Sequence, residues 1–226
     1  MTATLPLLLI NPNTNGATTR RMVAIAGSAM PDGQTVEGAT ARWGAPLIDD
    51  DAKLAASADA ALELAASMEL SRYSGVIVAA FGDPGLEALK AASPVPVTGI
   101  AEAGMIEAAA GGRRFSIVTT TPQLAKAIHC KVVDYGFGDL FAGLQLTEGE
   151  PAELMRDPEQ LEARLALACE TAVSDDGAEA VVIGGGPLAV AAASLSRLFT
   201  VPIVEPVPAA ARLALTRAAM AGVDSQ

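Results

Sequence analysis

The sequence predicts an α/β protein of two similar lobes, each a mostly parallel sheet flanked by helices, related by internal duplication. Short apolar runs alternate with helical segments along the chain, which is typical of parallel sheets covered on both faces. In addition, the apolar run 75–80 with its small turn and Pro84 recurs as the run 181–187. We therefore expect one lobe in residues 1–105 and a second in residues 106–206.

Matching segments recur at nearly constant spacing, which indicates one unit copied once. The equivalent pairs are Ala80 and Gly185 (185 − 80 = 105), Val95 and Val201 (201 − 95 = 106), and Leu8 and Ser116 (116 − 8 = 108).

In the first half, β-branched and Leu-rich runs predict strands, and Ala-rich segments predict helices. Asn13 or Thr14 is expected to cap the first helix, and Asp83 to cap a helix that starts at Pro84. The expected strands are 7–10, 35–42, 75–80 and 95–100, and the expected helices are 14–28, 52–70, 84–91 and 101–110.

The second half follows the same plan. Thr121 is expected to cap a helix that begins at Pro122. The expected strands end at residues 118, 146, 183 and 204, and the expected helices are 122–134, 158–173, one ending near 198, and 207–221. The last helix, 207–221, is a candidate to pack on the first lobe.

The composition and net charge exclude several classes of function. The chain has 226 residues, of which 51% are hydrophobic, and a net charge of −11. This charge argues against nucleic acid or an anionic membrane as partner, although a local site can still bind a small anion. One His and two cysteines, Cys130 and Cys169, give no metal-ligand set. With neither a signal peptide nor a spanning segment recognised, the sequence predicts a cytoplasmic protein.

Four turns follow the expected strand ends, where folds of this class bind ligands. They are residues 11–13, 80–83, 119–121 and 184–186, and they would line one cleft if the lobes face each other. Free backbone N–H groups in such turns suit an anion or a polarised carbonyl. The expected substrate-binding residues are Asn11, Asn13, Ala80, Phe81, Gly82, Thr119, Thr120, Thr121, Gly185, Gly186 and Glu205.

Several motifs resemble those of the aspartate/glutamate racemase superfamily, and within it the hydantoin and allantoin racemase branch. They are Ile10–Thr14, Ala80–Leu86, Gly99–Ala103, Asp175–Glu179 and Val201–Pro206, so the resemblance covers nearly the whole chain. It implies two α/β lobes with the active site between them, no cofactor, a small carboxylate or cyclic ureide as substrate, and a homo-oligomer.

One departure from the family stands out. In the family's racemases a cysteine ends each of the two motif strands, whereas this chain has Ala80 and Gly185 there. Racemisation needs a base on one face of the carbon and an acid on the other, and two thiols of tuned pKa can serve both roles. Cys130 and Cys169 lie inside expected helices and cannot replace them. We therefore expect chemistry other than two-thiol racemisation.

Several readings stay open at this point. Asp83 is either an acid–base group or only a helix cap, and Glu205 either reaches the cleft or is a solvated turn residue. The chain is an enzyme of the superfamily with altered chemistry, such as decarboxylation, hydrolysis, elimination or isomerisation. Alternatively, it is a catalytically silent small-molecule-binding protein, or a cysteine-free variant of a hydantoin-type racemase.

Overall fold

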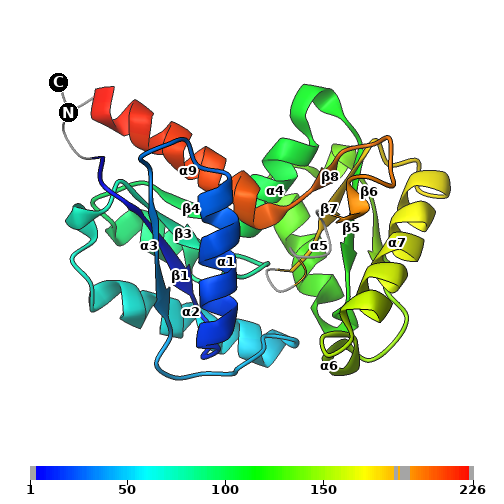
Figure 1. Cartoon of the computed structure of the whole chain (residues 1–226), viewed down its shortest axis with the longest axis horizontal. Coiled ribbons are helices and arrows are strands. Elements are labelled where there is room, and N and C mark those ends of the chain that lie inside the picture. Colours follow the sequence, from blue (N-terminus) through cyan, green and yellow to red (C-terminus); the bar gives the residue numbers. More distant parts are fainter. Residues whose placement is uncertain (1–3, 186–187, 189–193, 224–226) are drawn as a thin grey trace. The chain divides into compact units, whose positions relative to one another are not determined.

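A computed structural model gives the fold (Figure 1) and describes residues 4–185, 188 and 194–223. The chain divides into two compact units. We call Met1–Ala103 together with Val207–Gln226 unit 1, and Gly104–Pro206 unit 2. The C-terminal helix thus belongs to unit 1, although it directly follows the last strand of unit 2 in sequence.

The sheet of unit 1 has four parallel strands in the order β2-β1-β3-β4. The two central strands, β1 and β3, are buried at every position, which explains their uninterrupted apolar sequences. The strands are β1 (Leu7–Asn11), β2 (Val36–Thr40), β3 (Gly75–Val78) and β4 (Val97–Gly99).

Helices flank this sheet, and α1 passes in front of it in Figure 1. Met22 and Ala26 of α1, and Ala61 of α2, are buried. The helical elements are α1 (Gly16–Ser28), α2 (Asp51–Ala66), the short 3-10 helix η1 (Leu70–Arg72), α3 (Leu86–Ala92) and α9 (Pro206–Val223), with α4 (Ile100–Ala108) crossing the division between the units.

The sheet of unit 2 repeats this topology in the order β6-β5-β7-β8, again with every pair parallel. Its core joins Val118 and Ile183 of the sheet to Leu165 and Cys169 of α7, all fully buried. The strands are β5 (Phe115–Thr119), β6 (Phe141–Leu146), β7 (Ala180–Ile183) and β8 (Ile203–Val204).

Helices also flank the second sheet, with α7 packed against β5 and β6. The expected helix that ends near residue 198 lies partly outside the described residues. The described elements are η2 (Ala110–Gly112), η3 (Pro122–Leu124), α5 (Ala125–Asp134), η4 (Gly138–Leu140), α6 (Pro151–Leu154) and α7 (Pro158–Ser174).

The predicted fold of two parallel sheets flanked by helices is confirmed, and equivalent hydrogen bonds at the strand ends support the duplication. In one pair of equivalent bonds, a carbonyl of the first central strand (β1 or β5) accepts from the residue after the second central strand (β3 or β7). In the other pair, the last residue of β1 or β5 accepts from the residue after the neighbouring edge strand (β2 or β6). The bonds are Ala79 N to Ile10 O at 2.8 Å with Gly184 N to Val118 O at 2.7 Å, and Ala41 N to Asn11 O at 2.9 Å with Thr147 N to Thr119 O at 3.0 Å.

Two expected helix caps are wrong. Asn15, and neither Asn13 nor Thr14, caps α1, because the Asn13 side-chain oxygen already accepts the Asn15 N–H at 2.9 Å. Asp83 does not cap a helix at Pro84 either. Helix α3 begins at Leu86, after Gly85 in a left-handed conformation, and the Asp83 carboxylate is used elsewhere.

Candidate active site

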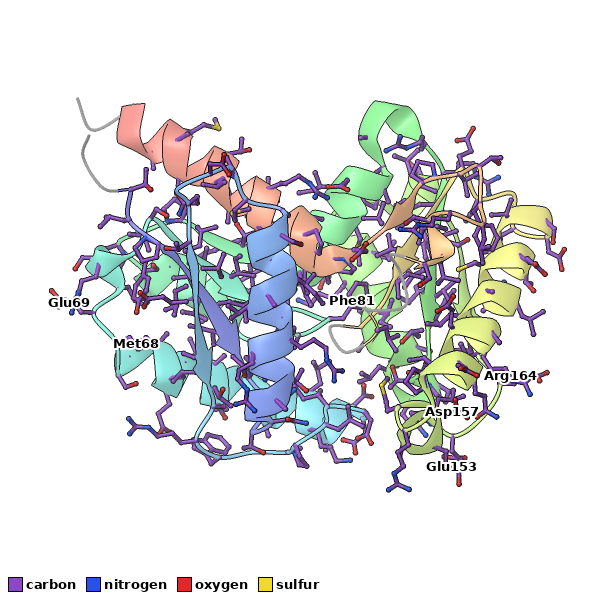
Figure 2. The ribbon with its side chains drawn as sticks, viewed as in Figure 1. Met68, Glu69, Phe81, Glu153, Asp157 and Arg164 are labelled. Atoms are coloured by element: carbon purple, nitrogen blue, oxygen red, sulfur yellow. The ribbon has the colours of Figure 1, made fainter. Side chains whose placement is uncertain are left out.

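The turn after β3 carries the residues that the sequence singled out first. Asp83 N donates to Ala80 O at 3.0 Å and closes the turn. Gly82 has φ 112° and Asp83 has φ 49°, so two successive residues are left-handed. Glycine adopts this conformation without a steric penalty, and aspartate tolerates it better than most residues. Phe81 on this turn is labelled in Figure 2 and is only 7% exposed.

The backbone donors of this turn are available to a ligand. Among the described residues, the N–H groups of Ala80, Phe81 and Gly82 have no hydrogen-bond acceptor. All three residues are buried, and buried N–H groups in folded proteins nearly always have an acceptor. Successive unpaired N–H groups suit a carbonyl or carboxylate oxygen, so this turn can bind and polarise one.

The asparagine loop after β1 is held together by its own side chains. Asn11 Nδ2 donates to Asn13 Oδ1 and Thr19 Oγ1, each at 2.9 Å, and its Oδ1 accepts the Asn13 N–H at 3.2 Å. Asn11 is fully buried, so these bonds make it a positioning residue of the loop. In contrast, Asn13 Nδ2 donates to no described residue, which leaves a donor on this loop for a ligand.

Asp83 ties the turn to the start of α4. Its two carboxylate oxygens accept the N–H groups of Ala101 at 2.9 Å and Glu102 at 2.7 Å, and the residue is 1% exposed. Gly99 makes room for this contact, because a Cβ on Gly99 would overlap the Asp83 carboxyl group. The Asp83 carboxylate therefore caps α4, and not the helix that the sequence placed at Pro84. An acid–base role for Asp83 finds no support in this arrangement.

A partly buried ion-pair network, centred on the buried Glu102, lies beside this cap. Arg217 of α9 donates to both Glu102 carboxylate oxygens, at 2.8 and 2.9 Å, and Lys90 donates to one of them at 3.0 Å. Arg217 also donates to Val97 O and Thr98 Oγ1. Burial works to raise the pKa of Glu102, but the hydrogen bonds from Arg217 and Lys90 outweigh it and lower that pKa below its ordinary value. The network fastens α9 to the strand ends of unit 1.

Unit 2 places hydroxyl groups at the end of β5. Thr119 Oγ1 donates to Gly184 O at 2.8 Å and lies 3.0 Å from Thr121 Oγ1. Thr119 and Thr120 are each 1% exposed, and Thr121 is partly buried. Thr121 precedes η3, as expected, but its side chain makes no capping hydrogen bond.

The structure places the remaining candidates of unit 2 at the ends of β7 and β8. Gly185 follows β7, and its N–H bonds to Ile183 O at 3.0 Å. Glu205 follows β8 and is partly buried. Gly186 lies outside the described residues. The described candidates of unit 2 therefore lie at the ends of three strands, β5, β7 and β8, and a hydrogen bond from Thr119 to Gly184 O links the first two.

Neither cysteine lies at a strand end. Cys130 is exposed on α5, and Cys169 is fully buried on α7. Burial raises the pKa of Cys169 to about 12, so this thiol stays protonated near neutral pH. His129, on α5, is exposed and packs edge-on against Phe141.

Neither a cluster of metal-binding side chains nor a helix able to span a membrane occurs in the described part of the chain. No three His, Cys, Asp or Glu side chains within the described ranges are grouped closely enough to hold a metal ion. In the same part of the chain, every helix is too short or too polar to cross a membrane.

Two duplicated parallel α/β units with polar groups beyond their strand ends define a protein class that binds small ligands at those ends. The chain belongs to the Asp/Glu/Hydantoin racemase family, whose pattern matches residues 7–214. Within this family it falls in the hydantoin-racemase-like branch.

Individual relatives agree with this assignment. The hydantoin racemase of Paenarthrobacter aurescens is 30% identical over 209 residues, covering 92% of this chain and 89% of the relative. The structure of allantoin racemase from Klebsiella pneumoniae superimposes with a TM-score of 0.91 at 31% identity, covering 96% of this chain and 89% of that one. Arylmalonate decarboxylase, at 16% identity and a TM-score of 0.67, shares the fold over 94% of this chain and 92% of its own.

The sequence singled out Gly99–Ala103 as a motif but gave no role to Gly99 or Glu102, and it missed Arg217. Gly99 had a usable signal, since a glycine between a strand and a helix often marks a close approach of another group. The contact between Glu102 and Arg217 joins residues more than a hundred positions apart, and no local sequence pattern predicts it.

Proposed function

We propose that the chain is a cofactor-independent enzyme that acts on a small carboxylate or cyclic ureide without two-thiol racemisation. Its family membership and its hydantoin and allantoin racemase relatives support the substrate class. The single observation that carries the proposal is a combination of groups at the strand ends. These ends keep donors that can bind a substrate oxygen, but the positions equivalent to the family's thiols hold Ala80 and Gly185.

The donors of the β3 turn suit a reaction in which negative charge develops on oxygen. When a bond to the carbon beside a carbonyl or carboxylate breaks, its electron pair spreads onto that oxygen, and preorganised N–H groups stabilise it. In a decarboxylation, the electron pair of the broken C–C bond remains on the substrate as an enolate, carbon dioxide leaves, and water protonates the carbon. No base is needed to start this reaction.

Racemisation has a different requirement. A proton must leave one face of the carbon and another must arrive at the opposite face. The methyl group of Ala80 and the hydrogen of Gly185 can carry neither proton, and the Asp83 carboxylate caps α4. We therefore favour decarboxylation or ring-opening hydrolysis, in which water attacks the polarised carbonyl, over elimination, which needs a base to remove a proton. The fold is compatible with such chemistry, because arylmalonate decarboxylase shares it.

The test is proton NMR in D2O on 5-substituted hydantoins, allantoin, methylmalonate, maleate, aspartate and glutamate. The wild type is compared with the double variant Ala80→Cys, Gly185→Cys. A Cβ at position 185 would come within 3.1 Å of the Leu188 side chain, whose flexible end can shift. We expect the wild type to open a ring or release carbon dioxide from one of these compounds.

Two outcomes contradict the proposal. Loss of optical rotation from an enantiopure hydantoin with the wild type would show racemisation despite the missing thiols. A silent wild type, with Cα exchange appearing only in the double variant, would favour the silent binding protein.

Thiol alkylation is an independent check. Iodoacetamide should modify the exposed Cys130, spare the buried Cys169, and leave turnover unchanged. Loss of turnover on alkylation of Cys130 would show that this thiol takes part in the reaction and would contradict the proposal.

A further inference from the structure

A groove in unit 2 lies between the end of β6 and one face of α7. It has a volume of about 170 Å³, and its lining includes Leu146 and Thr147 at the strand end and Arg164 and Leu167 on the helix. Thr147 is 8% exposed, and its buried hydroxyl oxygen has no hydrogen-bond partner among the described residues. Buried hydroxyl groups in folded proteins almost always have a partner, so a molecule that pairs with this one would gain affinity.

The corresponding groove of unit 1 shows what such a groove accommodates. Ala41 and Thr147 are equivalent, because the N–H of each donates to the last residue of the first central strand. The next two residues are Arg42-Trp43 in unit 1 and Glu148-Gly149 in unit 2. The indole N–H of Trp43 donates to Glu63 of α2 at 2.8 Å, and the hollow beside the ring measures only about 10 Å³. An indole ring therefore lies in the groove of unit 1, whereas unit 2 has no aromatic residue at this point of its chain.

The helices α2 and α7 line their grooves with equivalent faces. Buried positions of α2 recur in α7 at an offset of 104 residues (165 − 61 = 104), and the lining positions share this offset (164 − 60 = 104). Two lining residues differ in kind, because Ala60 is replaced by Arg164, and Glu63 is replaced by Leu167. Unit 2 therefore has a cation and an apolar side chain where unit 1 has a small residue and the acid that accepts the indole N–H.

The groove of unit 2 has one positive and one negative group at its edge. Arg164 on α7 (Figure 2) donates through Nη1 to Glu148 Oε2 at 2.8 Å, and the Glu148 side chain is 85% exposed. Ion pairs this exposed contribute little to stability, so both groups can exchange partners with a ligand. The guanidinium also has four further N–H donors. Leu146 and Leu167 are largely exposed for leucines and add apolar surface beside these charges.

We propose that this groove binds a free aromatic amino acid of the size of tryptophan. Its ring lies against Leu146 and Leu167, and the ring N–H pairs with the Thr147 hydroxyl group. Its carboxylate pairs with Arg164 and its ammonium group with Glu148, so each charge of the protein exchanges one partner for another. A zwitterion has no net charge, so the net charge of −11 does not repel it as it repels an anion.

This inference does not rest on the proposed function. None of the residues that line the groove is among the candidates at the strand ends. The proposed function is tested by turnover, and the groove is tested by binding, so the two can fail separately.

The experiment measures dissociation constants for the full chain by NMR titration with four probes. L-tryptophan has every group that the groove can bind. L-phenylalanine lacks the ring N–H, indole-3-propionate lacks the ammonium group, and tryptamine lacks the carboxylate. We expect L-tryptophan to bind about tenfold more tightly than indole-3-propionate or tryptamine, and several-fold more tightly than L-phenylalanine.

Three variants assign these preferences to single side chains. Arg164→Met should weaken L-tryptophan about tenfold and leave tryptamine unchanged, because tryptamine has no carboxylate. Glu148→Gln should weaken L-tryptophan and leave indole-3-propionate unchanged. Thr147→Val should abolish the preference for L-tryptophan over L-phenylalanine. Arg156→Met is the matched control, because Arg156 is an exposed arginine outside the lining of the groove, and it should change none of the dissociation constants.

Contrary outcomes are equally specific. Absence of L-tryptophan binding to the wild type at millimolar concentration would overturn the inference. Binding that neither Arg164→Met nor Glu148→Gln weakens would place the amino acid elsewhere on the protein and would overturn it as well. A preference over L-phenylalanine that survives Thr147→Val would refute the part assigned to the Thr147 hydroxyl group.

Discussion

The strand ends of the two units share a scaffold but differ in the residues that fix it. In unit 1, Asp83 reaches the start of α4, and Gly99 leaves the space for its carboxylate. In sequence, Pro187 repeats Pro84 and is preceded by a glycine where unit 1 has Asp83, and Val201–Pro206 repeats Val95–Ile100, so Glu205 stands at the position of Gly99 (99 + 106). Unit 2 therefore has no carboxylate before its proline, and its strand-end residue carries a carboxylate where unit 1 leaves space for one.

The comparison teaches that duplication preserved the backbone ladder while side chains diverged. Equivalent ladder bonds differ by only 0.1 Å between the units, at 2.8 and 2.7 Å. The same two-residue side-chain link follows β1 as Asn11 to Asn13 and β5 as Thr119 to Thr121. Amide groups leave the Asn13 Nδ2 donor free in unit 1, whereas unit 2 places hydroxyl groups there, which can donate or accept. One architecture therefore presents different hydrogen-bonding groups at its two strand ends.

The largest effect is expected at Gly99. Gly99→Ala should lower the free energy of unfolding by about 3–4 kcal/mol, because its Cβ displaces the Asp83 carboxylate and leaves two buried N–H groups unpaired. Urea denaturation measures this change. In an Asp83→Ala background the same substitution should cost much less, since the clashing group is gone.

Gly27 is the matched control for this prediction. It lies in α1 with open space around its Cα, so Gly27→Ala should stabilise the protein by about 0.5–1 kcal/mol. Equal losses of unfolding free energy at positions 99 and 27, or an undiminished loss in the double variant, would contradict the claim that Gly99 leaves the space occupied by the Asp83 carboxylate.

The next effect concerns the ion pairs of the two units. Arg217→Met should cost about 2–3 kcal/mol at pH 7, because it removes two hydrogen bonds from the buried Glu102 carboxylate while Lys90 remains. Arg164→Met in unit 2 should cost less than about 0.5 kcal/mol, because its partner Glu148 is exposed. Thermal and urea unfolding of both variants would measure the difference.

The Arg217 effect should also depend on pH. The pKa of Glu102 is lowered by folding, so its contribution to stability is complete above its ordinary value near 4.5 and is lost as pH falls through the folded value. The gap between wild type and Arg217→Met should therefore be constant from pH 7 to about 5.5 and narrow below 4.5. A gap that widens in acid would disprove the ionised state of Glu102.

Smaller effects than at Gly99 and Arg217 are expected for the two side-chain links. Asn11→Ala should cost about 2 kcal/mol, because the buried amide makes hydrogen bonds to Asn13, Asn15 and Thr19. Thr119→Val, which is similar in shape, should cost about 1 kcal/mol for its two hydrogen bonds. Reversal of this order in urea denaturation would show that Thr119 carries more of the local stability than its contacts indicate.

Local sequence patterns were enough to predict the elements and the strand ends. Apolar runs and turn residues marked β3, β5 and β7, and the spacing of the repeats indicated the duplication before any contact was known. The helix cap at Asp83 could not be predicted, because an aspartate before a proline suits a local cap equally well. Its partners, Ala101 and Glu102, are 18 and 19 residues further on, and only the folded sheet brings them close.

The site showed the same limit. The sequence identified Asn11, Asn13 and the three threonines as polar residues at strand ends, but it could not distinguish which hydroxyl or amide groups are already engaged. That distinction depends on single acceptors such as Gly184 O and Thr19 Oγ1. Which donors and acceptors remain available to a ligand depends on the contacts in the folded structure, and residue type alone does not determine it.

The position of α9 has a consequence for biosynthesis. Unit 1 is completed by α9, which follows unit 2 in sequence, so the N-terminal 103 residues leave the ribosome without the helix that supplies Arg217. Until α9 is translated, Glu102 has only Lys90 as a charged partner, and the apolar surface that α9 covers is exposed. Unit 2 is contiguous in sequence and is complete earlier. The half that is translated first is therefore the half that finishes folding last, and a ribosome that stalls before residue 207 would release a chain whose first unit lacks part of its core.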